Sequence, residues 1–445
     1  MSYQPLHDPL DPRDQLFWEL AQARESGREV GHLEAAIATA LVSGPLAELL
    51  DLYRRVERAP RVKSWPYEEP SSYDEILAAC PPGVVTDEPH ALDGATLADR
   101  LLAAWRGRCA GCVLGKPVEG WSREEIRRLL DSRDAYPLAD WFPEPRDDSE
   151  AHAYRGCWVE TVQGRIASVS RDDDIDYSIL ALHLLEEVGF EFGPRDVARE
   201  WLDHFPYTQI YTAERAAYRN LLRGVAPPGT ADTENPYREW IGAQIRADVF
   251  GWVSPGRPAD AARLAFQDAS LSHTANGIYG EMWAAALIAA SFTAPDLEAA
   301  VRRSMAFVPT RSRLHEALAE VIGAYEEGVD WEEARDRIER RTGHYEFVHT
   351  INNAAVVAAS LLWGGDDFTR VIGLAVQGGW DTDCNGATAG SAFGARYGTA
   401  AIPERWYEPF DDIVRSALFG FDHSRISDFA VRTLALARAT GRGGS

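Results

Sequence analysis

The chain has 445 residues, of which 45% are hydrophobic, so it is long enough to bury a large core. Its 69 aspartate and glutamate residues outnumber its 45 lysine and arginine residues, which gives a net charge of −24 with no obvious basic patch. A surface this acidic repels nucleic acid and anionic lipid, so we expect neither nucleic acid nor a membrane as a partner.

The cysteines and the N-terminus favour a cytoplasmic protein. Five scattered cysteines argue against a disulfide framework and for a reducing compartment. Cys109 and Cys112 form a Cys-x-x-Cys pair, but no partner stands nearby at zinc-ligand spacing, so we interpret both as small core residues. The N-terminus lacks a basic region followed by an apolar one, and no apolar stretch approaches the roughly 20 residues that span a membrane.

Residues 1–91 are expected to form an N-terminal helical extension with an arm. Between Asp14 and about Val56, apolar residues recur at helical spacing. From Ala59 to Pro82 the chain is rich in proline and aromatic residues, which favours an ordered arm that wraps the main body over a disordered linker. Residues 92–440 are then expected to form the main domain, and residues 441–445 a flexible tail.

The main domain is expected to be a succession of helices. Helical patterns cover 99–114, 197–204, 212–223, 236–247, 258–270, 282–292, 297–306, 312–327, 331–342, 351–363 and 367–376, and segments 413–418 and 426–440 close the fold. A glycine-bearing turn is expected at 250–256. Because no alternating β-branched segments with hairpin turns occur, the sequence predicts an all-α fold, a compact bundle of many helices.

Two loops of the main domain are candidates for facing a pocket. The helix 99–114 ends in a glycine-proline turn that carries Glu119. The segment 131–158 is irregular and rich in aromatic residues, and it lies between Glu119 and the acidic run at 172–174. A loop of this length in a compact domain is usually functional or mobile, so we hypothesise that it is a lid whose Trp141 contacts substrate.

Acidic residues gather at two expected helix starts. Asp172, Asp173 and Asp174 open one apolar run, and Asp381 and Asp383 lie on a glycine-flanked turn before a helix of small residues. Carboxylates inside a helical bundle need compensating cations or hydrogen bonds. Together with Glu119 they suit two hard cations, since Mg²⁺ prefers carboxylate oxygen and a pair of ions can activate a water. Either cluster alone is also typical of a solvated surface.

These motifs together resemble the ADP-ribosylglycohydrolase family. The resemblance rests on a glycine-rich helix that ends in Pro-Val-Glu, the acidic triplet, and Gly-Gly-x-Asp-Thr-Asp-x-x-Gly-Ala-x-Ala-Gly from Gly378 to Gly390. It implies an all-α fold with a binuclear Mg²⁺ centre, Mn²⁺ being the alternative ion. It also implies hydrolysis of the bond between C1″ of ADP-ribose and an acceptor on a protein or a small molecule.

The resemblance also implies roles for single residues. By motif position, Asp172, Asp173, Asp174, Asp381 and Asp383 match metal ligands. Glu119, Asp173 and Asp383 are the implied catalytic residues, with Glu119 near the attacking water. The implied substrate contacts, besides Trp141, are His273, Asn276, Gly277, Tyr279 and Arg246. For His273 alone, a capping or core histidine is an equally good interpretation.

Several departures from the family pattern leave the substrate open. Asp172 replaces a threonine ligand, Ile175 a following threonine, and Cys384 a threonine that helps to bind metal. The N-terminal extension has no counterpart in compact family members, and the long aromatic loop is unusual. Three functions therefore stay open: removal of ADP-ribose from proteins, hydrolysis of an N-glycosidic bond in a free nucleoside or nucleotide, and binding of ADP-ribose without catalysis.

Overall fold

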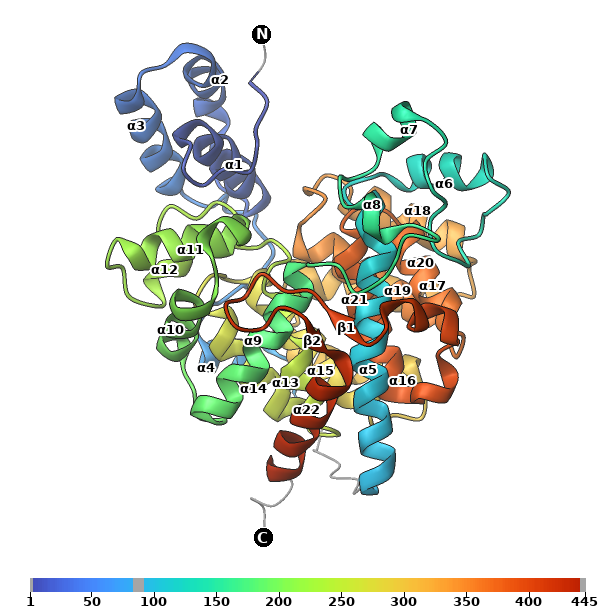
Figure 1. Cartoon of the computed structure of the whole chain (residues 1–445). Helices are drawn as coiled ribbons and strands as arrows, with labels where there is room; N and C mark the ends of the chain where they lie inside the picture. The colour runs from blue at the N-terminus through green and yellow to red at the C-terminus, as the bar shows by residue number, and fades with distance from the viewer. Residues whose placement is uncertain (1–2, 83–91, 441–445) are drawn as a thin grey trace.

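The computed structural model describes residues 3–82 and 92–440, and within them helices make up nearly all of the regular secondary structure (Figure 1). A two-stranded antiparallel ribbon, β1 (Ile413–Val414) and β2 (Ser424–Arg425), is the single sheet of this part of the chain. The all-α prediction is confirmed. None of the described helices is both long enough and apolar enough to cross a membrane. The expected flexible tail, 441–445, lies outside the described residues.

Eleven helices of the described residues cover the N-terminal extension, its arm and the first part of the main domain. The extension and arm contain α1 (Pro12–Glu25), α2 (Glu34–Ser43), α3 (Leu46–Glu57) and α4 (Tyr73–Ala79). The main domain begins with α5 (Gly94–Gly115), α6 (Arg123–Asp131), α7 (Asp148–Ala153), α8 (Trp158–Thr161), α9 (Asp173–Val188), α10 (Pro194–His204) and α11 (Thr212–Leu222). Short 3₁₀ turns join them: η1 (Gly31–Leu33), η2 (Lys116–Val118) and η3 (Tyr207–Gln209).

The second part of the main domain continues in the same way. Its helices are α12 (Gly229–Asp232), α13 (Asp248–Trp252), α14 (Pro258–Ala269), α15 (Asn276–Ser291), α16 (Leu297–Ser304), α17 (Arg313–Glu326), α18 (Trp331–Thr342), α19 (Thr350–Gly364), α20 (Phe368–Gln377), α21 (Thr382–Tyr397) and α22 (Ile426–Thr440). The 3₁₀ turns here are η4 (Gln244–Arg246), η5 (Met305–Phe307), η6 (Thr399–Ala401), η7 (Glu404–Trp406) and η8 (Glu408–Phe410).

The N-terminal extension has a small core of its own. Helices α1 to α3 enclose an apolar cluster built around Leu16, Val30 and Leu52, and they stand apart from the main body at the upper left of Figure 1. The outer face of α1 places Trp18 against Trp240 of the main domain, with ring centroids 5.1 Å apart. The extension is therefore joined to the main domain through α1.

The arm between residues 59 and 82 is ordered along the main domain. The Glu69 carboxylate accepts hydrogen bonds from the buried guanidinium of Arg313, with Nε of Arg313 2.9 Å from Oε1, and from Asn276. The hydroxyl of Tyr279 donates to the carbonyl of Pro70. These contacts replace the water that would otherwise solvate the polar start of α15.

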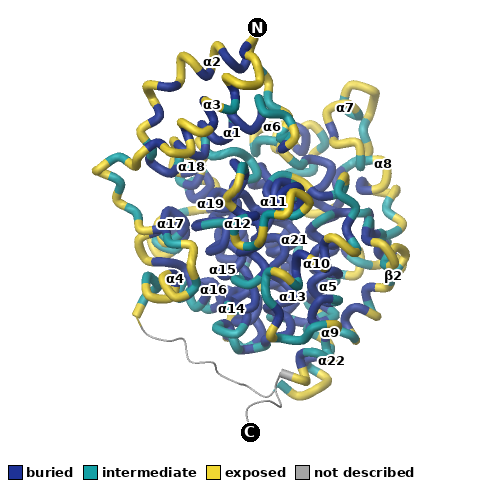
Figure 2. The backbone as a smooth tube through the Cα atoms, turned by 90° about the vertical axis from the view of Figure 1, so that its left-hand side faces the viewer, coloured by how far each residue is buried: buried dark blue, intermediate teal, exposed yellow. Residues whose placement is uncertain are grey.

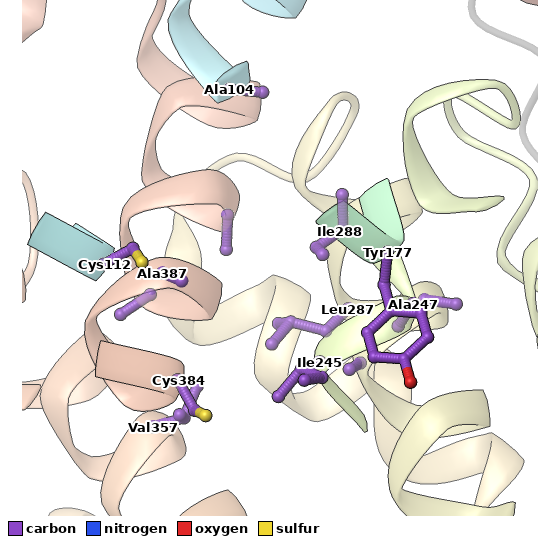
Figure 3. Close-up of a cluster of buried hydrophobic side chains, with 14 of the residues drawn as sticks. Ala104, Cys112, Tyr177, Ile245, Ala247, Leu287, Ile288, Val357, Cys384 and Ala387 are labelled. Atoms are coloured by element: carbon purple, nitrogen blue, oxygen red, sulfur yellow. The ribbon is translucent and has the colours of Figure 1, made fainter. Parts of the chain in front are cut away.

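Helices α5 and α21 lie at the centre of the main domain and touch along their backbones. A Cβ added to Gly111 would lie 1.9 Å from the carbonyl oxygen of Gly386, and one added to Gly107 would lie 2.1 Å from that of Gly390. Such distances exclude any side chain, so the small residues are required for this approach. The two helices run through the buried interior (Figure 2), and the labelled Cys112 and Ala387 meet between them (Figure 3).

One predicted element near residue 250 is wrong and a second is correct in part. The expected helix 236–247 is a series of turns ending in η4, whereas of the expected turn at 250–256 the first three residues belong to α13 and residues 253–256 do form a turn. The backbone near Trp240 bonds across to another segment instead of along a helix: the N–H of Ile241 donates to Val348, and the Thr350 hydroxyl donates to the carbonyl of Trp240. Tertiary hydrogen bonds here outweigh local helix propensity.

The aromatic loop does not present Trp141 to substrate, which corrects the lid hypothesis. The Trp141 side chain is buried, its ring centroid lies 4.8 Å from that of Trp406, and its Nε1 donates to the carbonyl of Arg405 at 3.0 Å. Phe142 is fully buried. Both residues therefore anchor the loop to the body of the protein.

We expect the substitution Trp141→Ala to destabilise the protein. Removing a packed indole leaves a cavity and costs about 3–5 kcal/mol of unfolding free energy, so the melting temperature should fall by several degrees. Val159→Ala, at a residue 54% exposed on α8, is the matched control and should leave the melting temperature almost unchanged. A Trp141→Ala protein with native melting temperature but a raised KM would restore the lid hypothesis.

Candidate active site

A cavity of about 670 Å³ opens where several helix ends meet. Its lining includes the carboxylates of Glu119, Asp172, Asp173, Asp381 and Asp383, which the sequence placed in one site. Basic side chains alternate with them: Lys116, Arg155, Arg171 and Arg215 also line the cavity. The acidic residues of two distant chain segments thus share one pocket with several built-in cations.

The first acidic cluster is held at the N-terminus of α9. Asp172 caps the helix, and its Oδ1 accepts the backbone N–H of Asp174 at 2.9 Å. Arg108, fully buried in α5, donates to the carbonyl and the carboxylate of Asp174 and pairs with Asp248 at 2.8 Å. Aspartate is a favoured capping residue, so the local sequence itself starts the helix here, and Arg108 ties that start to α5.

Asn353 of α19 positions the second acidic cluster. Its Oδ1 accepts the backbone N–H of Asp381 at 3.2 Å and the Nδ2 of Asn385 at 2.8 Å. Its own Nδ2 donates to the carbonyls of Phe347 and His349. Asn353 is buried, and these four bonds use its amide completely, so it fixes where α21 begins.

The loop that carries Glu119 is bonded to the turn that carries Asp381. The N–H of Gly120 donates to the carbonyl of Trp380 at 2.8 Å, and the N–H of Trp380 donates to the carbonyl of Trp121 at 2.9 Å. Trp380 has a φ of 69°, an uncommon value for a residue with a side chain. This reciprocal pair brings Glu119 to the mouth of the acidic site, where Arg155 binds its carboxylate at 2.6 Å.

Burial and mutual repulsion raise most of the site's carboxyl pKa values. The pKa values of Asp173 and Asp383 lie well above their usual range because of burial and then of neighbouring carboxylates. Burial and the charge of Glu119 raise the pKa of Asp381 to about 7. Asp172 is the exception: burial raises its pKa, but the Lys116 ammonium at 2.9 Å outweighs this and holds it below the usual value.

Two thiols flank the carboxylates. Cys112 has its sulfur within 4.8 Å of carboxylate oxygens of Asp172 and Asp174, and Cys384 stands in the same relation to Asp174 and Asp383. Burial raises the pKa of each thiol well above its ordinary value, so both are neutral at pH 7. Neutral thiols are poor ligands for a hard cation, which leaves the binding to oxygen.

The donor set fits divalent cations. Ionising several neighbouring buried carboxyl groups costs free energy, which is why their pKa values are raised. A bound divalent cation would offset that cost. One oxygen of Asp383, Oδ1, is buried without a hydrogen-bond partner among the described residues. An unpartnered buried acceptor of this kind is satisfied by a metal ion or its water.

The five other residues expected to contact substrate do not line the cavity, which corrects that expectation. Arg246 lies one layer behind it, bound to Glu214 at 2.6 Å and to Asp268. His273 is buried with its Nδ1 2.8 Å from the Ser272 hydroxyl. Asn276 and Tyr279 are hydrogen-bonded to the arm. Gly277, between them, packs so closely on another segment that an added Cβ would lie 2.6 Å from the carbonyl oxygen of Arg238.

Sequence reasoning missed several residues that hold the site together. Lys116 and Arg155 compensate carboxylates, Arg108 links α5 to α9, and Asn353 positions α21. The position of Arg108 among the small residues of α5 was a usable signal, since a charged residue on such a close-packed face is rarely buried unless it is paired. Asn353 gave no signal, because a single amide in a helix does not indicate its partners.

Three comparisons found known proteins that the chain is similar to. The family model described as ADP-ribosylglycohydrolase matches residues 93–442. An uncharacterized protein of Archaeoglobus fulgidus is 28% identical over 316 residues, which cover 69% of this chain and 90% of that protein. A solved structure described as an ADP-ribosylglycohydrolase-related protein complex is 21% identical, with a TM-score of 0.46 over 77% of this chain and 99% of that chain.

We expect Mg²⁺ to stabilise the protein more at high pH than at low pH. A carboxyl whose folded pKa is raised, such as Asp381 at about 7, contributes stability in the metal-free protein that is complete below about pH 4 and is lost as the pH rises through 7. Mg²⁺ must displace those protons, so its effect should grow as they leave.

Thermal unfolding with Mg²⁺ or EDTA from pH 5 to pH 8 measures this effect. The increment in melting temperature should increase across the range and be much smaller in an Asp383→Asn variant. An increment that stays constant with pH, or that survives the substitution in full, would contradict the metal assignment.

Proposed function

Because the chain belongs to the ADP-ribosylglycohydrolase family, we propose that it is a metal-dependent glycohydrolase that cleaves the C1″ bond of an ADP-ribosyl group. One observation carries this proposal: the carboxylates of two distant helix starts and of Glu119 line a single cavity. The number and burial of these carboxylates suit a metal-dependent hydrolase better than a hydrolase that works with two carboxylates and no metal. Its free cysteines favour a reducing compartment, so we place the enzyme in the cytoplasm.

In this proposal five aspartates hold two Mg²⁺ ions, with Mn²⁺ as the alternative. The ligands are Asp172, Asp173, Asp174, Asp381 and Asp383. Bound there, the ions would supply Lewis-acid chemistry, which polarises ribose hydroxyls and lowers the pKa of a water. Two of the five aspartates already have partners: Asp172 bonds through Oδ1 to the N–H of Asp174 and through Oδ2 to Lys116, and Asp174 bonds through Oδ1 to Arg108. These contacts orient the two carboxylates, and a carboxylate oxygen with one partner keeps a lone pair for a further ligand.

The reaction itself needs a base, a nucleophilic water and stabilisation of positive charge on the ribose. Water attacks C1″ as the bond to the acceptor breaks. The proton of that water passes to a carboxylate, and a carboxyl group of the site returns a proton to the departing acceptor. Glu119, Asp173 and Asp383 are the candidate bases. The transition state of glycoside hydrolysis resembles an oxocarbenium ion, which the surrounding carboxylates would stabilise. Arg155 holds Glu119 at the cavity mouth and is its positioning residue.

A small, free substrate is the second candidate, favoured by the N-terminal extension. Leu6 and His7 form part of the cavity wall. The buried carboxylate of Asp14 accepts the N–H groups of Leu6 and Asp8, which fixes the turn between them, and the His7 ring packs 4.9 Å from Trp240. A wall built from the extension narrows the approach for a folded protein, and 670 Å³ falls in the usual range for small-molecule pockets.

A hydrolysis assay tests the proposal. Arginine-linked and serine-linked ADP-ribosyl peptides, and free nucleosides and nucleotides with an N-glycosidic bond, are incubated with enzyme in Mg²⁺ or EDTA. We expect release that requires Mg²⁺ and that Asp383→Asn lowers by at least about 100-fold. Asp422→Asn, at a surface aspartate paired with Arg415, is the control and should retain full activity.

The outcome separates the remaining functions. Release from peptides identifies the enzyme as a protein de-ADP-ribosylating hydrolase and gives the linkage. Hydrolysis of free compounds alone supports the small-substrate function. Metal binding without turnover of any of these compounds would contradict catalysis and leave a silent relative that binds ADP-ribose.

A further inference from the structure

A second group of metal-ligating side chains lies on α9 and α10, away from the acidic cavity. It consists of His183 on α9 with Glu200 and His204 on α10, whose ligand atoms all lie within 4.8 Å of one another. Glu200 and His204 are four residues apart and so project from the same face of α10. His183 is nine residues beyond Asp174 along α9, which is roughly 13 Å at the rise of a helix.

The carboxylate at the centre of this group has few partners. The Glu200 side chain is 8% exposed, Nδ1 of His183 is hydrogen-bonded to its Oε1, and Nε2 of His204 lies 3.6 Å from the same oxygen. Among the described residues, neither lysine nor arginine pairs with it. Apart from the two imidazoles, nothing among the described side chains compensates the negative charge of this buried carboxylate. A cation between the three side chains would supply the missing charge.

The two histidines of this group are partly exposed to solvent on one side and packed against Phe421 on the other. The side chains of His183 and His204 are 21% and 26% exposed, so an ion could enter from solvent and keep a water. The Phe421 ring packs edge-on against both imidazoles, with centroids 5.2 and 5.7 Å away. The N–H of Phe419 donates to the carbonyl of His204 at 3.0 Å, so the segment around Phe421 is fixed to the end of α10.

We propose that His183, Glu200 and His204 form a separate site for a divalent transition-metal ion of the zinc class. Two imidazoles and one carboxylate, with a fourth position open to water, are a ligand set that Zn²⁺ uses in proteins. Imidazole ligands select such ions over Mg²⁺, whereas the aspartates of the cavity favour hard cations. The two centres therefore differ in metal preference, and the new site does not depend on the proposed hydrolase function.

A bound ion would clamp α9 to α10. The same α9 begins with the acidic triplet of the cavity, and Asp176 near that end accepts a hydrogen bond from the Ser416 hydroxyl at 2.6 Å. The segment from Ser416 to Phe421 thus contacts α9 at one end and the histidine group at the other. The ion would act on the stability of this corner of the fold.

Metal titration of the full chain tests this site. The protein is stripped with EDTA, saturated with Mg²⁺ to occupy the acidic centre, and titrated with Zn²⁺ against a chromogenic chelator. We expect one Zn²⁺ per chain and a higher melting temperature. His204→Gln should weaken Zn²⁺ binding at least about 100-fold, because it removes a ligand. His423→Gln, at a surface histidine beside Asp422, should bind Zn²⁺ like the wild type.

Two further measurements make the result decisive even when a variant folds poorly. In the wild-type protein, Co²⁺ in place of Zn²⁺ should give the intense visible absorption of a four- or five-coordinate site with nitrogen ligands. Asp383→Asn should keep this spectrum. The weak spectrum of six-coordinate Co²⁺, no stoichiometric Zn²⁺ binding in the presence of Mg²⁺, or loss of the bound ion in Asp383→Asn would each overturn the proposal.

Discussion

The candidate active site depends on the contact between α5 and α21. At Gly107, Gly111 and Gly386 the two helices approach so closely that backbone meets backbone, and no side chain separates them. Because α5 runs into the turn with Lys116 and Glu119 while α21 starts immediately after Asp381, this contact carries both turns to the same point. The small residues of the two helices therefore determine the geometry of the charged ones.

Charge compensation is the second physical constraint. A cluster of buried carboxylates would push the site apart or remain protonated unless cations were close. The chain supplies some of them itself: Arg108 for Asp174, Lys116 for Asp172 and Arg155 for Glu119. The negative charge that these basic residues do not compensate lies at Asp173, Asp381 and Asp383, whose pKa values are raised. Metal ions there would complete the balance, so the site's electrostatics and its proposed chemistry have one origin.

The sequence predicted the parts of this structure that have local signals. The helical class follows from apolar periodicity, and both acidic clusters stand at helix starts because Asp172 and Asp381 occupy the capping positions. The order along the chain could not show that Gly120 and Trp380 exchange hydrogen bonds, or that Asn353 fixes the start of α21. Those contacts join segments more than 25 residues apart, and each uses a backbone group or a single amide with no distinctive pattern.

The wrong predictions of ligand contacts at α15 and at Trp141 share one physical cause. The polar, glycine-rich start of α15 was expected to bind a ligand, but the arm satisfies it, with Glu69 accepting from Asn276 and Pro70 from Tyr279. Likewise, Trp141 was expected to contact substrate and instead packs on Trp406. In each case a segment of the same chain occupies the position that sequence reasoning assigned to a ligand. Polar or aromatic residues in a loop indicate that these side chains need a partner, but the sequence does not show whether the partner is a ligand or another segment of the chain.

The most direct test of this account is the Mg²⁺ affinity of a Gly115→Ala variant, measured by calorimetry. A Cβ at Gly115 would lie 2.3 Å from the backbone nitrogen of Asp383, so the methyl group should displace the start of α21 and weaken Mg²⁺ binding. Gly323→Ala is the control, since Gly323 also lies in a helix but has open space around it, and it should bind Mg²⁺ normally with equal or higher stability. A Gly115→Ala protein with native Mg²⁺ affinity and melting temperature would contradict the claim that the close approach of α5 and α21 positions the metal centre.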